Sequence, residues 1–128
     1  LDDIVALSLN MDYDDGFVAY LNGVEIARAN IGSPGDVPAW DLELDIDHEA
    51  VLYTGGYPDT FDLEDYIDVL QEGANVLAVE VHNVSVNSSD MSALAFLHAG
   101  LSTPNSLYNE TPDWFLAPFT DCEGIGTQ

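Results

Sequence analysis

The densest group of oxygen-bearing side chains lies near the start of the sequence, at Asn10, Asp12, Asp14 and Asp15. Alternate residues of a strand project to one face, and Gly16 lets the backbone bend after them. Hard oxygen ligands in this number suit Ca²⁺, but the spacing and the strands predicted on either side exclude an EF-hand. The sequence therefore predicts a Ca²⁺ site here, with a solvated Asx-rich turn as the alternative.

Arg28 is the only Lys or Arg side chain in a chain with 24 acidic residues, so we expect it to be ion-paired. Arginine binds a carboxylate through two parallel N–H donors. A bidentate pair with Asp14, Asp15 or Glu80 would attach the strand that carries Arg28 to the rest of the fold. We expect a structural role for this pair rather than ligand binding.

A second polar group could form at Glu80, His82 and Asp90, if the loop over residues 84–91 folds back. A Glu-x-His pair on one strand face can ligate a metal or act as acid and base. A single pair of this kind is also common as a structural contact. The interpretation that we prefer is therefore polar contact between His82, Asp90 and this loop.

Aromatic residues offer a third kind of chemistry, because flat rings stack on the apolar faces of sugars. The candidates are Trp40, Tyr53, Tyr57 and Trp114, with Asp, Asn or Arg supplying hydrogen bonds to hydroxyl groups. Packing in the core is the alternative for the two tryptophans.

No catalytic signature accompanies these groups. The sequence has no Ser-His-Asp spacing, no glycine-rich phosphate loop and no zinc motif. Paired carboxylates occur throughout so acidic a chain, so their pairing does not indicate a glycosidase. We expect a protein that is not an enzyme.

The overall charge restricts the partners. The net charge is −23, while 47% of the residues are hydrophobic, so the chain should fold and then suffer strong self-repulsion. Bound divalent cations, high salt or a cationic partner would offset that repulsion, which favours an extracellular or cell-surface location. No basic patch exists to bind nucleic acid or anionic lipid, and no apolar run is long enough to insert in a membrane.

The elements that must position these residues are mostly strands. At 128 residues the chain has the length of one domain. Asn22-Gly23 is a strong signal for a two-residue type I′ hairpin turn. Alternation of apolar and polar residues predicts strands over residues 4–11, 17–21, 24–29, 40–47, 75–83 and 92–101, with a loop over 12–16. Helical spacing predicts one short helix over 61–71, with Asp62 as a possible N-cap.

Short strands separated by regular turn signals predict an all-β antiparallel β-sandwich over residues 1–101. Residues 102–128 form a C-terminal tail that contains Trp114 and other aromatic residues. So dense an apolar group should pack on the domain or on a partner.

Two blocks of sequence resemble galactose-binding-like jelly-roll modules, which are appended to many secreted bacterial hydrolases and surface proteins. One block runs from Asp14 through Asn22-Gly23 to Asn30, and the other comprises Leu70, Gly73, 75–83 and 88–92. The resemblance implies a jelly-roll sandwich and a non-catalytic carbohydrate-binding role. The superfold hosts several functions, so it implies the architecture more strongly than the role.

The chain departs from that pattern at its start, because similar modules begin with a further strand before the position of Leu7. A strand from a neighbouring chain could complete the sheet, as in donor-strand complementation. The second hypothesis is therefore a structural subunit of a surface layer, filament or adhesin, forming a homo-oligomer or polymer. The expected partners are thus carbohydrate or neighbouring protein subunits.

Overall fold

The computed structural model describes residues 1–102, so Trp114 and the predicted tail from residue 103 on lie outside the described residues. Within residues 1–102, six strands and two short 3₁₀ helices follow one another. In order they are β1 (Ile4–Asp14), β2 (Gly16–Leu21), β3 (Val24–Ala29), η1 (Leu52–Thr54), β4 (Asp59–Asp62), η2 (Glu64–Val69), β5 (Leu77–His82) and β6 (Ser92–Leu101). Neither helix of this part of the chain is long and apolar enough to cross a bilayer.

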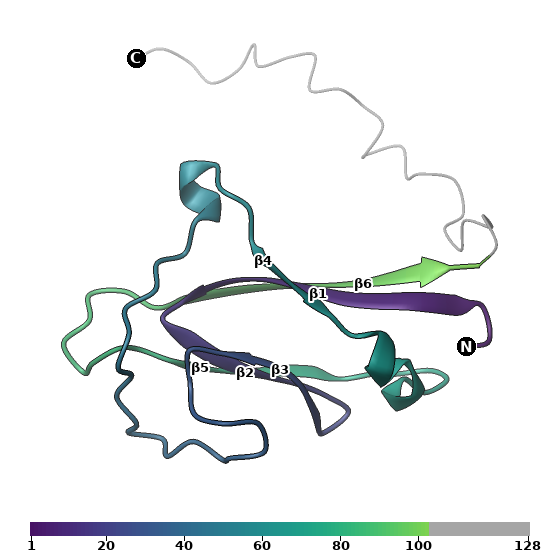
Figure 1. Ribbon diagram of the computed structural model, residues 1–128, viewed down its shortest axis with the longest axis horizontal. Helices are drawn as coiled ribbons and strands as arrows, with labels where there is room; N and C mark the ends of the chain where they lie inside the picture. The colour runs from purple at the N-terminus through teal and green to yellow at the C-terminus, as the bar shows by residue number, and fades with distance from the viewer. Residues whose placement is uncertain (103–128) are drawn as a thin grey trace, which may run out of the picture.

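The strands form two three-stranded antiparallel sheets, with the orders β4-β1-β6 and β3-β2-β5. The sheets lie in two layers in Figure 1, and β1 and β6 run side by side over almost their whole length. Only Asp15 separates β1 from β2, so the chain passes from one sheet to the other at that residue. The predicted all-β, antiparallel class is confirmed.

The core lies between the two sheets and follows the alternation of their strands. Leu7, Leu9 and Met11 of β1 are at most 2% exposed, as the period of two predicts. Phe17, Ala19 and Leu21 of β2 are fully buried in the same cluster, together with Tyr13, Ile26, Ala27 and Leu63. One face of each central strand therefore supplies most of the buried apolar surface.

The hairpin between β2 and β3 has the predicted turn. Asn22 and Gly23 have φ angles of 50° and 84°, both positive as a type I′ turn requires. The Asn22 side chain also reaches the segment before β5: its Nδ2 donates to the Val69 carbonyl at 2.9 Å, and its Oδ1 accepts from the Val76 N–H at 2.9 Å. The turn is thus bound to the neighbouring loop as well as closing its own hairpin.

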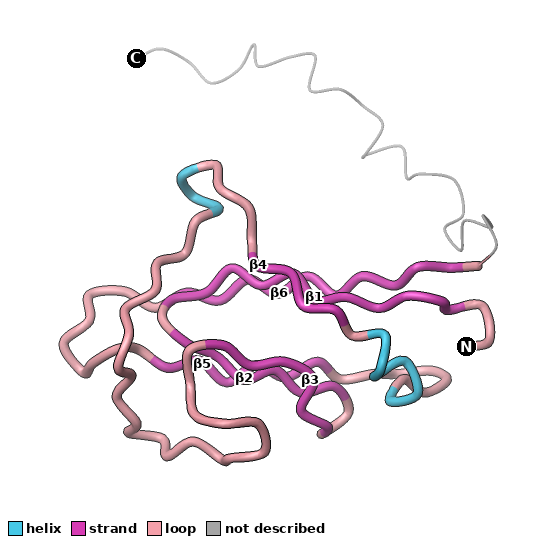
Figure 2. The backbone as a smooth tube through the Cα atoms, in the orientation of Figure 1, coloured by secondary structure: helices cyan, strands magenta, loops and turns pink. Residues whose placement is uncertain are grey.

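The strand predicted over residues 40–47 is wrong, since this segment belongs to the long loop between β3 and η1 (Figure 2). Only Leu44 of its alternating apolar residues is buried, where it packs with Val18 and Ile31 on the outer face of β2. Leu42 and Ile46 are 39% and 64% exposed. Leu44 can be buried without strand pairing, and residues 40–47 pair with no strand of either sheet.

The helix predicted over residues 61–71 is replaced by β4 and the single 3₁₀ segment η2. Phe61 lies opposite Leu9 in the sheet, and its ring meets the ring of Phe17 edge-on at 5.4 Å. The first two residues of the predicted helix, Phe61 and Asp62, are therefore paired with β1 in a sheet. The N-cap position of η2 is Leu63 and no side chain caps it, so the prediction of Asp62 as the N-cap is wrong; Asp62 Oδ1 accepts a hydrogen bond from the Glu64 N–H at 2.9 Å.

Candidate functional site

Three aspartates that are almost fully buried lie where β1 ends, two of them on the strand and Asp15 directly after it. Asp12, Asp14 and Asp15 are 4%, 4% and 2% exposed. The loop predicted over residues 12–16 is wrong, because β1 continues to Asp14 and pairs there with Ser92 of β6. Buried carboxylates are costly unless they are hydrogen-bonded, paired or bound to a metal, so the partners of each one decide its role.

Asp12 is satisfied by the backbone of the loop that crosses it. Its Oδ1 accepts from the Val51 N–H at 2.7 Å, and its Oδ2 accepts from the Leu52 N–H at 3.1 Å. These charge-assisted bonds fix the loop just before η1 against β1. Both oxygens already have donors, so Asp12 serves as an anchor for this loop.

Asp15 joins two loops in the same way. Its Oδ1 accepts from the His48 N–H at 2.8 Å, and its Oδ2 accepts from the Val84 N–H at 2.7 Å. The Asn30 side chain donates to the Asp15 carbonyl at 2.9 Å. Asp15 therefore holds the loop after β3 and the loop after β5 at the point where the chain changes sheets.

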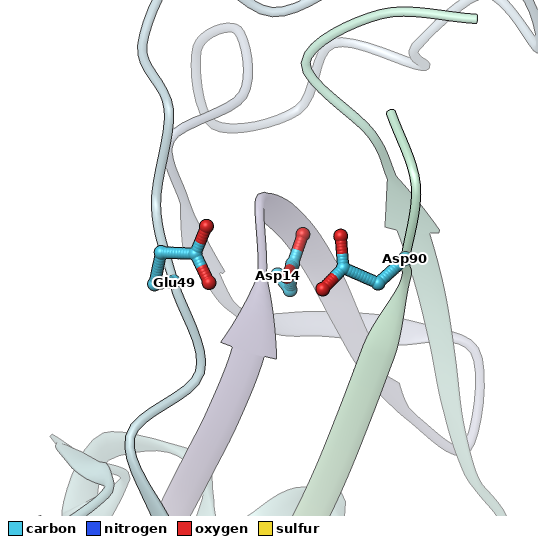
Figure 3. A group of neighbouring side chains, drawn as sticks. All are labelled: Asp14, Glu49 and Asp90. Atoms are coloured by element: carbon cyan, nitrogen blue, oxygen red, sulfur yellow. The ribbon is translucent and has the colours of Figure 1, made fainter. Parts of the chain in front are cut away.

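Asp14 differs from its two neighbours. The backbone N–H groups of the adjacent loops bind Asp12 and Asp15, whereas the Asp14 side chain forms a hydrogen bond with that of Asp15. The Asp14 carboxylate also lies between those of Glu49 and Asp90 (Figure 3), and one oxygen from each of these three lies within 4.8 Å of the others. Burial, followed by the charges of Asp15, Asp90 and Glu49, raises the pKa of Asp14 to about 6.

Glu49 and Asp90 come from two exposed loops, one on each side of the end of β1 (Figure 3). The first loop is fixed beside Asp14 by the residue before Glu49. The His48 ring stacks on the Tyr13 ring with centroids 4.0 Å apart, and its Nδ1 lies 3.0 Å from the Tyr13 carbonyl oxygen. Asp90 precedes β6, so the pairing of β6 with β1 brings it to the same end of the sheet.

The structure therefore separates the four residues for which a Ca²⁺ site was predicted. Asp14 is in the acidic cluster, whereas Asp12 and Asp15 bind backbone amides and Asn10 lies in the paired middle of β1. Sequence reasoning missed Glu49, because nothing in the spacing of an acidic loop distinguishes one carboxylate from the next.

Arg28 forms the bidentate pair that was expected, but with a different partner. Its Nε donates to Glu25 Oε1 at 2.8 Å and its Nη2 donates to Glu25 Oε2 at 2.9 Å. The guanidinium holds the pKa of Glu25 below its usual value. The prediction of Glu80 is wrong, because Arg28 and Glu80 lie opposite Val18 on its two sides. Two strand spacings, about 10 Å, separate them. Asp14 and Asp15 are not its partners either.

Glu80 instead contacts His82, as the Glu-x-His pattern allowed. His82 Nε2 lies 2.9 Å from Glu80 Oε1, and its Nδ1 lies 3.4 Å from the Leu42 carbonyl oxygen. His82 is buried, so this pair attaches the loop around Leu42 to the edge strand β5. Asp90 does not join them, and this part of the prediction is wrong because Asp90 lies beside Asp14.

The aromatic candidates separate into two places. Trp40 is 89% exposed and lines a pocket of about 300 Å³ between the loop after β3 and the loop after β5. Tyr53 and Tyr57 are 79% and 90% exposed. They belong to the segment around η1 that projects beyond the sheets in Figure 1. Trp40 is thus a surface residue rather than part of the core.

The pocket beside Trp40 combines polar and apolar groups. Leu42, Val81, Val86 and Met91 supply apolar surface, and the polar residues of its lining are Asp41, Glu43, His82, Asn83 and Ser85. The arrangement can present a flat indole next to carboxylate, amide and hydroxyl groups. Such a surface suits a ligand with both apolar faces and hydroxyl groups.

Comparisons of the chain with protein-family models, curated proteins and solved structures find no significant match.

Proposed function

We propose that this chain is a non-catalytic carbohydrate-binding module of an extracellular or cell-surface protein, with a galactose-binding-like jelly-roll sandwich as its fold. The observation that carries the proposal is Trp40, an 89% exposed indole at the edge of a pocket. Exposing so large an apolar ring to water has a cost that a ligand would remove on binding.

The rest of the lining supports a sugar as that ligand. Asp41, Glu43, Asn83 and Ser85 offer acceptors and donors for hydroxyl groups. The volume, about 300 Å³, is at the lower end of the range of small-ligand pockets. A net charge of −23 disfavours anionic glycans, so the expected ligand is a neutral or amino sugar.

The two loops that form the pocket have many fixed contacts, which supports a preformed site. Leu44 donates its backbone N–H to the Val84 carbonyl at 3.2 Å, so one loop is bonded to the other. His82 contacts both Glu80 and the Leu42 carbonyl, so its ring is engaged in structure rather than presented for acid–base chemistry. Preformed sites lose less entropy on binding.

The test is a glycan array followed by calorimetry with any glycan that binds. Trp40→Ala should abolish binding and leave the melting temperature unchanged, because the indole is exposed. Tyr57→Ala is the matched control, an equally exposed aromatic outside the pocket, and should bind as the wild type does. Absence of binding to every glycan would refute the proposal, and loss of binding in Tyr57→Ala alone would move the site to the projecting segment.

The second candidate is a subunit of a surface assembly, and β6 favours it. This strand is a ten-residue edge of its sheet, and its outward residues Leu94 and Phe96 are 51% and 45% exposed. An exposed, partly apolar edge can pair with a strand of a neighbouring chain. Light scattering over a range of concentrations tests this: the wild type should associate at high salt, whereas Phe96→Lys should stay monomeric.

A further inference from the structure

We propose that two copies of this chain pair through β6, edge to edge and antiparallel, to form a closed dimer with a twofold axis. This dimer rests on the second candidate function, a subunit of an assembly, and specifies its partner. The neighbouring strand is β6 of an identical chain, and association stops at two chains. The backbone, the charge and the outward side chains of β6 support this pairing.

The backbone of β6 has free hydrogen-bonding groups along its outer edge. The Leu7 carbonyl of β1 accepts from the Leu63 N–H at 3.0 Å, on the side of β1 where β4 lies. Backbone groups alternate in direction along a strand, so those of Asn10 point the other way, toward Phe96 of β6. The intervening residues of β6 direct their N–H and C=O groups away from β1, and no other segment of residues 1–102 binds them. They are Ala93, Ala95, Leu97 and Ala99.

Among the edge strands of residues 1–102, only β6 lacks an acidic side chain. Its ten residues include no Asp, Glu, Lys or Arg. The other edge strands carry carboxylates, with Glu25 on β3, Asp59 on β4 and Glu80 on β5. Charged side chains on an edge strand disfavour pairing with another chain. Such protection is therefore missing at β6 alone.

The charge of the whole chain favours an identical chain as the partner of this strand. A cationic partner would bind where carboxylates are dense, and β6 has none. Two copies with a net charge of −23 each repel one another over most of their surfaces. Pairing of β6 with its copy brings together two strands without carboxylates. A twofold axis uses the β6 edge of both chains, so no further copy can add at this strand.

The side chains of β6 indicate the register of the pair. Leu94 and Phe96 are 51% and 45% exposed, whereas Ala95 and Leu97 pack against the core. Opposite residues of an antiparallel pair share a face, and aromatic pairs stabilise a sheet. Phe96 therefore lies opposite its own copy at the twofold axis, and Leu94 lies opposite His98 of the second chain. The two β4-β1-β6 sheets become one continuous sheet.

Sedimentation velocity of the full chain over a range of concentrations tests the dimer. We expect an equilibrium between one and two chains, with stronger pairing as NaCl is raised, because salt screens the repulsion between acidic chains. A chain that stays monomeric at every concentration and salt would refute both the dimer and the assembly candidate. Growth into ever larger species would leave the assembly candidate in place and overturn the closed dimer.

Hydrogen exchange identifies what occupies the edge. The amides of Ala95 and Leu97 should exchange freely in dilute solution and become protected at the concentrations at which the dimer forms. Protection that does not depend on concentration would assign the edge to residues 103–128 of the same chain, and would overturn the proposal.

Two lysine variants separate pairing at β6 from a general effect of charge. Phe96 and Val24 are both 45% exposed, on the edge strands β6 and β3. Phe96→Lys should weaken the dimer at least about tenfold, because the ammonium group would meet its own copy at the axis. Val24→Lys adds the same charge and should pair as the wild type does. Both variants should melt as the dilute wild type does, and equal pairing in the two would refute the role of β6.

Cysteine cross-linking tests the register. Cys122→Ser is the background, because Cys122 is the only cysteine of the sequence. On mild oxidation, a mixture of Leu94→Cys and His98→Cys chains should form a disulfide between unlike chains, since opposite residues lie within reach of one another. Neither chain alone should cross-link. Equal cross-linking in each chain alone, or none in the mixture, would contradict the proposed pairing.

Discussion

Arg28 and Glu25 lie three residues apart on β3, yet their side chains meet in a bidentate ion pair. Residues three apart on a regular strand project to opposite faces. The register between β2 and β3 shifts between Ala19 and Tyr20, and the extra residue, Ile26, is a β-bulge. The bulge returns Glu25 to the face of Arg28, so an irregularity in pairing creates the only Arg–carboxylate pair of the described residues.

The first prediction concerns this pair. Arg28 also donates to the carbonyls of Ile31 and Asp36, at 3.1 and 2.7 Å, so it fixes the start of the loop after β3. Arg28→Ala should lower the free energy of unfolding by about 2–3 kcal/mol, because several charge-assisted bonds are lost. Arg28→Lys should recover less than half of this, since an ammonium group cannot form the fork.

Urea unfolding measures both changes. Glu72→Gln removes an exposed acid and is expected to change the free energy by no more than about 0.5 kcal/mol. If Arg28→Lys were as stable as the wild type, the bidentate geometry would contribute nothing.

The second prediction concerns pH. Arg28 lowers the pKa of Glu25 from its ordinary value of 4.5, so the pair contributes its full stability above that value. The contribution is lost as the pH falls through the lowered pKa of the folded state. The difference in unfolding free energy between the wild type and Glu25→Gln should therefore be constant from about pH 8 to 6 and shrink below pH 4.5. If the difference in unfolding free energy were unchanged at pH 3, the ion pair between Arg28 and Glu25 would not be its cause.

The third prediction concerns Asp15 as the anchor of two loops. Asp15→Asn retains one acceptor and places an amide group against the other backbone N–H, so it should cost about 1–3 kcal/mol. Hydrogen exchange should accelerate at the amides of His48 and Val84, which donate to this carboxylate. Asp68→Asn is the exposed control. Faster exchange at the same two amides in that variant would contradict the claim that Asp15 protects them.

The fourth prediction separates the two roles of the Asn22-Gly23 turn. Gly23→Ala should cost about 1–2 kcal/mol, because a Cβ is disfavoured at a φ of 84°. Asn22→Gly keeps the turn conformation but loses the bonds to Val69 and Val76, so it should cost about 1–2 kcal/mol through a different cause. Thermal unfolding of both variants gives the comparison, and a neutral Asn22→Gly would show that the side-chain bonds are dispensable.

Local rules predict the parts of this fold that depend on neighbours in the sequence. Leu7, Leu9 and Met11 alternate because one face of β1 is buried, and Asn22-Gly23 forms its turn because both residues accept positive φ. The strand limits of β5 and β6 also follow the alternation closely. These features need no knowledge of distant segments.

The parts that depend on distant partners could not be predicted. Glu25 reaches Arg28 only because of a bulge, and Phe61 is in a strand because β1 offers it a partner. Asp90 and Glu49 are brought to Asp14 by the pairing of β6 and by the anchoring of His48. In a chain with 24 acidic residues, only tertiary structure distinguishes the carboxylates that converge from those that face water.

Because Arg28 is the only Lys or Arg of the sequence, it also determines where trypsin can cleave the chain. Trypsin cleaves after Lys or Arg because a carboxylate lines its specificity pocket. This sequence offers one such bond, between Arg28 and Ala29 at the end of β3, and the guanidinium there is already bound to Glu25. Tryptic cleavage thus requires β3 to open, so the rate at which two fragments appear would report the local opening of a single strand.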